Sequence, residues 1–261
     1  MIEAKNITVA IESKKLLDYV SLSLQAGEVL IVIGQNGAGK STLRKVLSGD
    51  LQPTSGEVWM NNRLLSAWTL PERARVRAVL PQDSALSFPF TVLEVVLMGR
   101  APHVSGAESK RDYEIARRAL EAVEAAHLED RIYPTLSGGE RQRVHLARVL
   151  AQIWESVGST QTRCLLLDEP ISNVDIAHQH QILRIARNLA KQQVAVLVIL
   201  HDLNLAAQYA DKIAMLKNGR IIALDVPDRI LTEELIQETF GVAVGVIKHP
   251  YLNCPLIIWR S

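Results

Sequence analysis

Apolar and polar residues alternate in two different ways along this chain. The uninterrupted apolar runs 29–33 and 194–200 have the length of buried strands, whereas Val20, Leu22 and Leu24 alternate with polar residues as on a half-buried strand. Antiparallel strands early in the chain and parallel-type strands later predict a mixed sheet. We therefore expect an α/β fold with an antiparallel β part at the N-terminus.

Turn residues join further pairs of strands. Asn61-Asn62 connects 57–60 to 63–65 as a hairpin, and 217–220 is a second hairpin turn between apolar runs. The same patterns predict a short strand over 77–82, a helix over 232–240 that begins at Thr232, and a small β addition from 244–247 and 255–259.

Between these parts the periodicity becomes helical. Apolar residues recur at helical spacing within 109–127, where Ser109 and Asp112 form a capping box, and 91–98 has the same character. We therefore expect an inserted helical segment over 85–157. The remaining chain then divides into a core of 1–84 and 158–240 and a β extension over 241–261.

Composition and charge narrow the function classes. The 261 residues are 48% hydrophobic and 22% charged with a formal net charge of +1, so we expect a soluble globular protein with no nucleic acid as partner. No apolar run reaches the length of a membrane span, and residues 1–6 show no charged-then-apolar leader. We expect neither a disulfide nor a metal role for Cys164 and Cys254, whose spacing fits no zinc site.

One motif organises the rest of the chain. Residues 34–42 fit G-x-x-x-x-G-K-[ST] between the apolar run 29–33 and a helix expected to open near Lys40. In such a loop, glycines let backbone N–H groups curl around phosphate, at the positive end of the following helix. Lys40 would reach the β- and γ-phosphates and Ser41 would hold Mg²⁺, unless the segment is only a glycine-rich turn. The candidate nucleotide-binding residues are Gly34, Gln35, Asn36, Gly37, Ala38, Gly39, Lys40, Ser41 and Thr42.

Two further strand ends carry polar residues. Asp168 and Glu169 follow a buried strand, at the end where ligands bind in open α/β sheets. Asp168 suits Mg²⁺, directly or through water, and Glu169 could orient and deprotonate an attacking water. His201 follows the last long apolar run and could contact the γ-phosphate, or it could merely precede a helix with Asp202 as its N-cap.

A second pair of glycines opens another predicted helix. Ser137, Gly138 and Gly139 offer bare N–H groups, a positive helix end and a hydroxyl, which could bind phosphate or form only a turn. His178 and His180 are two residues apart and therefore point to different sides of a helix. This spacing favours a solvated face over a metal site.

Together these motifs resemble the ATP-binding-cassette (ABC) ATPases over nearly the whole chain. The phosphate loop, Gln82, 136–142, 165–170 and His201 occur in the order of that family. The resemblance implies a P-loop NTPase (RecA-like) core, ATP and Mg²⁺ as cofactors, and a homodimer in which the Ser-Gly-Gly of each chain serves the partner's nucleotide. The catalytic residues it implies are Glu169, His201 and Gln82, and the metal ligands are Ser41, Gln82 and Asp168.

Within that family the chain is most similar to import cassettes for iron-siderophores, haem and cobalamin, on the basis of residues 87–103. The resemblance implies an ATP-hydrolysing subunit on a membrane permease dimer at the cytoplasmic face of the inner membrane, served indirectly by a substrate-binding protein. We expect Arg100 and His103 to take part in coupling ATP hydrolysis to transport by the permease. The stretches similar to haem (haemin) import ATPases are 146–154, the polar insert 155–163, 175–180 and 200–207.

The chain departs from the family pattern at two places. Family members usually place an aromatic ring under adenine near Ile11, and neither Ile11 nor its close neighbours are aromatic. We therefore expect Ile11 to hold adenine by apolar contact. Residues 172–175 are Ser-Asn-Val-Asp where Ser-Ala-Leu-Asp is usual in the family. Only Ser172 and Asp175 match that pattern, and the resemblance implies that Asp175 contacts the nucleotide.

Other classes of protein share part of this set. Cassette ATPases of iron–sulfur assembly or of ribosomes have the nucleotide motifs without a permease. A nucleotide kinase or GTPase shares only the phosphate loop and would leave Ser137 and His201 without a role. A non-catalytic nucleotide-binding regulator would lack the acid that stands here at Glu169.

Overall fold

The computed structural model describes residues 1–82, 86, 88–155, 161–172 and 174–260. The expectations for residues 87 and 173 and for most of the polar insert 155–163 lie outside these residues. So do the predicted segment boundaries at 84/85 and 157/158.

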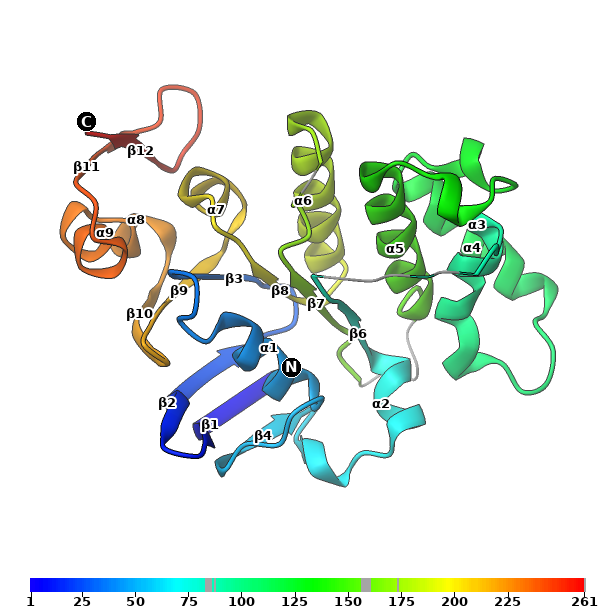
Figure 1. The fold of residues 1–261 in the computed structure, drawn as a ribbon, viewed down its shortest axis with the longest axis horizontal. Helices are drawn as coiled ribbons and strands as arrows, with labels where there is room; N and C mark the ends of the chain where they lie inside the picture. The colour runs from blue at the N-terminus through cyan, green and yellow to red at the C-terminus, as the bar shows by residue number, and fades with distance from the viewer. Residues whose placement is uncertain (83–85, 87, 156–160, 173, 261) are drawn as a thin grey trace.

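In this part of the chain a six-stranded sheet forms the centre of the fold (Figure 1). Its order is β10-β9-β3-β8-β7-β6, and every neighbouring pair is parallel except β10 and β9. Three of its strands are buried at every residue, which explains their uninterrupted apolar sequences. The strands are β3 (Val29–Ile33), β6 (Arg77–Leu80), β7 (Cys164–Asp168), β8 (Ala195–Ile199), β9 (Lys212–Lys217) and β10 (Arg220–Asp225).

A second sheet is antiparallel and has the order β2-β1-β4-β5. The predicted N-terminal antiparallel part and the hairpin across Asn61-Asn62 are therefore confirmed. Both asparagines have positive φ, 49° and 61°, which the favoured two-residue hairpin turn requires. The strands are β1 (Ile2–Ile11), β2 (Lys14–Leu24), β4 (Ser55–Met60) and β5 (Arg63–Leu64).

Helix α1, Lys40–Ser48, lies between the two sheets (Figure 1). Its Leu43 and Leu47 are fully buried in one cluster with Leu30 of β3 and Met60 of β4. Burying a leucine side chain stabilises a fold by about 1.5–3 kcal/mol. This packing fixes the start of α1 at the carboxyl end of β3.

The opposite face of the central sheet is covered by α6 and α7, while α3, α4 and α5 pack together at one side of the molecule (Figure 1). The predicted C-terminal helix and small β addition are present as α9 and the β11–β12 pair. The bounds are α3 (Val92–Leu97), α4 (Lys110–Ala122), α5 (Gly138–Gln152), α6 (Ile176–Lys191), α7 (Leu203–Tyr209), α8 (Pro227–Ile230), α9 (Glu233–Phe240), β11 (Val244–Lys248) and β12 (Pro255–Trp259). Four short 3₁₀ helices are described as well: η1 (Leu65–Ala67), η2 (Met98–His103), η3 (Ala126–Leu128) and η4 (Tyr133–Thr135).

Two helices differ from the sequence prediction. The capping box of Ser109 and Asp112 is confirmed, but α4 ends at Ala122 and not at 127. The chain leaves the helix there, because Glu124 takes a positive φ of 53°. Helix α2, Leu70–Val76, begins at a capping box of its own and was not predicted.

Arg100 is buried and its side chain offers no direct surface contact to a permease, so its part in coupling stays a prediction. It is 3% exposed and its Nε lies 2.9 Å from Asp112 Oδ1, while its Nη1 donates to the Ala151 carbonyl at 2.8 Å. A buried arginine with these partners holds η2 against α4 and α5. His103 is half-buried, with Nε2 2.7 Å from the Gln152 carbonyl oxygen.

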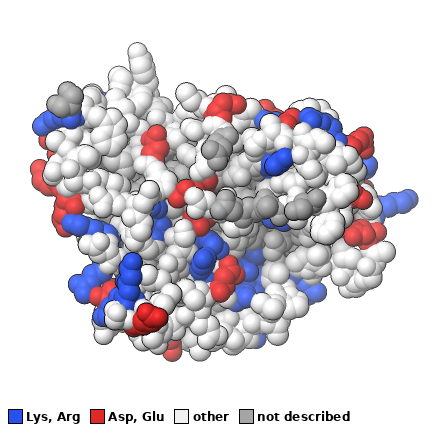
Figure 2. All heavy atoms as spheres, in the orientation of Figure 1, with Lys and Arg blue, Asp and Glu red and all other residues white. Residues whose placement is uncertain are grey.

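Cys164 and Cys254 are both buried, and both are free in the structure. None of the helices in the described ranges has the length and apolar character needed to cross a bilayer. Acidic and basic side chains are interspersed over the face shown in Figure 2, in keeping with the small net charge of +1.

Candidate functional site

Four adjacent parallel strands, β3, β8, β7 and β6, bring the predicted site residues to one edge of the central sheet. The phosphate loop follows β3, His201 follows β8, Asp168 and Glu169 end β7, and Gln82 follows β6. A cavity of about 530 Å³ lies there. Its lining residues are Lys14, Leu16, Asn36, Gly37, Gly39, Lys40, Ser41, Thr42, Gln82, Glu169 and His201.

The loop requires a glycine at the point where it enters α1. Gly39 has a φ of 106°, and a Cβ on it would lie 2.6 Å from the Leu16 carbonyl oxygen. Gly39 is also the N-cap of α1, without a side-chain cap hydrogen bond, so the first turn of the helix presents backbone N–H groups to the cavity. This end of the helix is therefore suited to an anion.

Lys40 is nearly buried beneath the loop that precedes it. Its Nζ donates to the carbonyl oxygens of Gly34 at 2.8 Å and Gln35 at 3.0 Å. Burial lowers the pKa of Lys40, while the charges of Glu169 and Asp168 oppose that shift. The Lys40 ammonium group thus lies between the loop and the carboxylates of Asp168 and Glu169, where it can contact the phosphates of a nucleotide.

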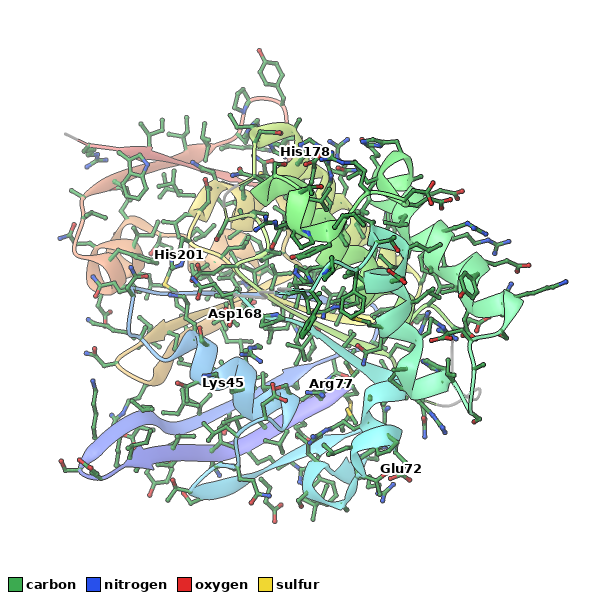
Figure 3. The ribbon with its side chains drawn as sticks, turned by 45° about the vertical axis from the view of Figure 1, so that its right-hand side comes forward. Lys45, Glu72, Arg77, Asp168, His178 and His201 are labelled. Carbon is green, nitrogen blue, oxygen red and sulfur yellow. The ribbon has the colours of Figure 1, made fainter. Side chains whose placement is uncertain are left out.

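Asp168 is a buried carboxylate in contact with α1. Its Oδ1 lies 3.5 Å from the Ser41 hydroxyl, and its Oδ2 accepts from Arg44 Nε at 3.3 Å. Burial raises the pKa of Asp168, and the Arg44 charge opposes this shift. Figure 3 shows Asp168 beside α1, the helix that carries Lys45.

The donors at this point fit Mg²⁺. A carboxylate, a hydroxyl and the nearby amide of Gln82 are hard ligands, and Mg²⁺ usually takes one or two protein oxygens together with water and phosphate. Within the described ranges there is no cluster of three or more His, Cys, Asp or Glu side chains able to bind a metal by themselves. The one carboxylate beside a hydroxyl matches the usual way in which Mg²⁺ is bound together with nucleotide phosphates.

Glu169 is held by the side chains on both sides of it. Gln82 Nε2 donates to its Oε2 at 2.9 Å, and His201 Nε2 lies 2.5 Å from its Oε1. Its backbone has a positive φ of 50°, a strained value of a kind that often occurs at functional sites. Asp202 caps α7 through the Leu205 N–H at 2.8 Å, so His201 both precedes a helix and contacts Glu169.

Ser137 begins α5 with a capping box, because its hydroxyl accepts from the Glu140 N–H while the Glu140 carboxylate accepts from the Ser137 N–H. Ser137 and Gly139 line a second cavity of about 350 Å³ together with Asp175. This cavity shares no lining residue with the cavity of the phosphate loop. In one chain, therefore, the Ser-Gly-Gly and the phosphate loop are not brought together.

The two histidines of α6 are half-buried, and the solvated face that their spacing favours stays a prediction. His178 Nδ1 lies 2.7 Å from Asp175 Oδ2, and its Nε2 contacts Arg143. His180 Nδ1 lies 2.9 Å from the hydroxyl of Tyr209. Figure 3 shows His178 well apart from Asp168, on the side of the second cavity.

Ile11 lies at the exposed end of β1, opposite Lys14, and is 58% exposed. It is not among the residues that line the phosphate-loop cavity, whereas Lys14 and Leu16 are. Contact between Ile11 and adenine stays a prediction. The sequence analysis missed Lys14 and Leu16, which line the cavity, and Arg44, which contacts Asp168.

A glycine-rich loop between a buried strand and a helix, in a mostly parallel sheet, defines a P-loop nucleotide-binding protein. The family described as ABC transporter matches residues 17–172. The chain belongs to this family and is an ABC-type ATPase, as the sequence motifs predict. The expected P-loop fold class is confirmed as well.

The chain is also similar to individual members of this family. The chain is 55% identical over 258 residues to the hemin import ATP-binding protein HmuV of Gloeobacter violaceus, with 99% of this chain and 94% of that protein covered. An inward-facing metal-chelate type ABC transporter has a TM-score of 0.82 at 26% identity, covering 100% of this chain and 97% of the other. A dimeric bacterial ABC transporter cassette has a TM-score of 0.76 at 27% identity, with 87% and 98% covered.

Proposed function

We propose that this chain hydrolyses ATP to drive the import of haem through a membrane permease. The observation that carries the ATPase part is the place of Glu169, held between Gln82 and His201 in the cavity of the phosphate loop. A carboxylate fixed by two hydrogen-bonding side chains can orient a water molecule and accept its proton.

The other residues act on the phosphates. Lys40 and the N–H groups of the loop and of the first turn of α1 stabilise the charge that develops on the transferred phosphoryl group. Mg²⁺, held by Ser41 and Asp168 with Gln82 beside them, would neutralise phosphate oxygens when bound. His201 lines the same cavity and would contact the γ-phosphate, while its contact with Glu169 fixes the direction of that carboxylate.

A homodimer completes the site. Ser137 and the Gly138 and Gly139 amides of one chain contact the nucleotide of the other chain, with Asp175 close to them. Two observations support this arrangement: the second cavity is separate from the first, and the dimeric cassette has the same fold. ATP closes the dimer because these contacts exist only in the closed state, and hydrolysis removes them.

The cargo and the location rest on relatives. Proteins named hemin import ATP-binding protein HmuV are similar to this chain over nearly its full length, which favours haem over an iron-siderophore or cobalamin. The permease dimer, a substrate-binding protein that delivers cargo to it, and the cytoplasmic face of the inner membrane belong to the same proposal. The core of 1–84 and 158–240 then binds ATP, 85–157 contacts the permease, and 241–261 is an appended β pair.

Reconstitution tests this function. The chain is assembled with its permease in vesicles, and ATP hydrolysis is measured after adding binding protein loaded with haem, with an iron-siderophore or with cobalamin. Stimulation by haem alone is the expected result. Stimulation by another cargo would reassign the importer, and equal hydrolysis with and without the permease would favour a cassette ATPase that works without one.

A further inference from the structure

Arg44 is a buried cation beside the proposed metal site. It lies on α1, three residues after Ser41, and is 6% exposed. An arginine in such a place requires partners for its charge, because an unpaired buried cation costs several kcal/mol. Its partners therefore indicate what it does.

The guanidinium joins two carboxylates that are far apart in the sequence. Its Nε lies 3.3 Å from Asp168 Oδ2, and its Nη1 lies 2.9 Å from Asp50 Oδ2. The other oxygen of Asp50 lies 3.3 Å from Arg77 Nη1, at the start of β6. Arg44 thus connects the end of β7, through α1, to the loop that follows α1.

The two oxygens of Asp168 consequently have separate partners. Oδ2 is occupied by Arg44, while Oδ1 faces the Ser41 hydroxyl at 3.5 Å. A carboxylate can turn about its Cβ–Cγ bond, and a partner on one oxygen fixes the direction of the other. Arg44 therefore aims Oδ1 of Asp168 toward Ser41.

We propose that Arg44 is a positioning residue for Mg²⁺, which keeps one oxygen of Asp168 aimed at the metal that Ser41 and the nucleotide share. This inference rests on the proposed use of Mg²⁺ with ATP. Outer partners that orient metal ligands typically change metal affinity by about 10–100-fold when removed. If Arg44 only held α1 in place, its replacement would lower the stability of the fold without changing the Mg²⁺ concentration that ATP binding requires.

The test measures binding, not turnover. A fluorescent ATP analogue is titrated onto the full-length chain in EDTA and over a range of Mg²⁺ concentrations, for the native chain, Arg44→Met and Asp50→Asn. Arg44→Met keeps the length of the apolar stem and loses the donors. Asp50→Asn is the matched control, because it weakens the other contact of Arg44 and leaves Asp168 and Arg44 intact.

We expect Arg44→Met to raise the half-saturating Mg²⁺ concentration about tenfold or more while affinity in EDTA changes less than about twofold, and Asp50→Asn to match the native chain. An unchanged Mg²⁺ requirement in Arg44→Met, or an equal rise in Asp50→Asn, would overturn the inference. If Arg44→Met does not fold, Arg44→Leu, which also lacks the donors, decides by the same criterion. A native chain whose binding is indifferent to Mg²⁺ would overturn the proposed metal use as well.

Discussion

His201 Nε2 lies 2.5 Å from Glu169 Oε1, although 32 residues separate them in the chain. The contact exists because β7 and β8 are parallel neighbours in the sheet and each residue follows the carboxyl end of its strand. With Gln82 on its other oxygen, the Glu169 carboxylate has a fixed direction into the cavity of the phosphate loop. The proposed chemistry depends on this arrangement.

Replacing Glu169 by glutamine should stop hydrolysis and preserve nucleotide binding. The amide keeps the size of the side chain but cannot accept a proton, so we expect the ATPase rate to fall by at least about 100-fold. Bound ATP that is not hydrolysed should then hold two chains together as a dimer that is visible by size-exclusion chromatography. The control is Glu238→Gln, an exposed acid paired with Lys217, which should keep native turnover. Near-native turnover in Glu169→Gln would remove this residue from its role.

Two glycines of the phosphate loop should respond differently to the same substitution. Both have positive φ, but a Cβ on Gly37 meets nothing within 4 Å whereas one on Gly39 lies 2.6 Å from the Leu16 carbonyl oxygen. We expect Gly37→Ala to lower the free energy of unfolding by about 1 kcal/mol and Gly39→Ala by about 3 kcal/mol or more. Gly39→Ala should also weaken ATP binding, because Leu16 lines the cavity. Equal losses measured by urea unfolding would contradict the loop geometry.

The ion pair of Arg100 and Asp112 should stabilise the packing of α4 on α5. Asp112 is 7% exposed, so removing its charge by Asp112→Asn leaves Arg100 with the more distant carboxylate of Glu155, 3.6 Å from its Nη2, and should cost about 3 kcal/mol near neutral pH. The surface pair of Arg117 and Glu129 provides the control, and Glu129→Gln should cost less than about 1 kcal/mol.

The same pair predicts a pH dependence. Burial raises the pKa of Asp112, but hydrogen bonds from Ser109 and from Arg100 outweigh this and bring the pKa to about 2, below its ordinary value of 3.8. Because the folded pKa is the lower one, the stabilisation is complete above pH 3.8 and is lost as the pH falls through about 2. The gap in unfolding free energy between the native chain and Asp112→Asn should therefore narrow over this window. A gap that stays constant from pH 5 to pH 2 would contradict the assignment.

Ser137 should matter for hydrolysis beyond its role as a helix cap. Ser137→Ala removes the cap of α5, and Ser109→Ala removes an equivalent capping box from α4, so each should cost about 1 kcal/mol of stability. Only Ser137→Ala should also lower the ATPase rate, because Ser137 lines the cavity that we assign to the partner's nucleotide. Equal ATPase rates in the two variants would limit Ser137 to capping.

Much of the site could be predicted from sequence because it is made of strand ends. Asp168, Glu169 and His201 each follow a buried apolar run, and parallel strands place their carboxyl ends at one edge of the sheet, where ligands bind. The phosphate loop could be predicted as well, because its glycines and its position between a strand and a helix are local features of the sequence.

Features that depend on contacts between distant segments could not be predicted. Arg44 and Asp168 are 124 positions apart, and nothing in the sequence pattern marks Arg44 as buried. The burial of Arg100 was not foreseen either, because a charged side chain is usually exposed and its partner Ala151 is 51 positions away. Helix α2 is short and carries an exposed Leu70, so its apolar periodicity was too weak to stand out.

The dependence of hydrolysis on protein concentration tests the central claim most directly. If each site needs the Ser-Gly-Gly of a second chain, the ATPase rate per chain should fall in proportion to concentration once the purified protein is diluted below its dimerisation constant, and rise again when the protein is concentrated. A rate per chain that stays constant down to concentrations at which light scattering shows only monomers would contradict the account.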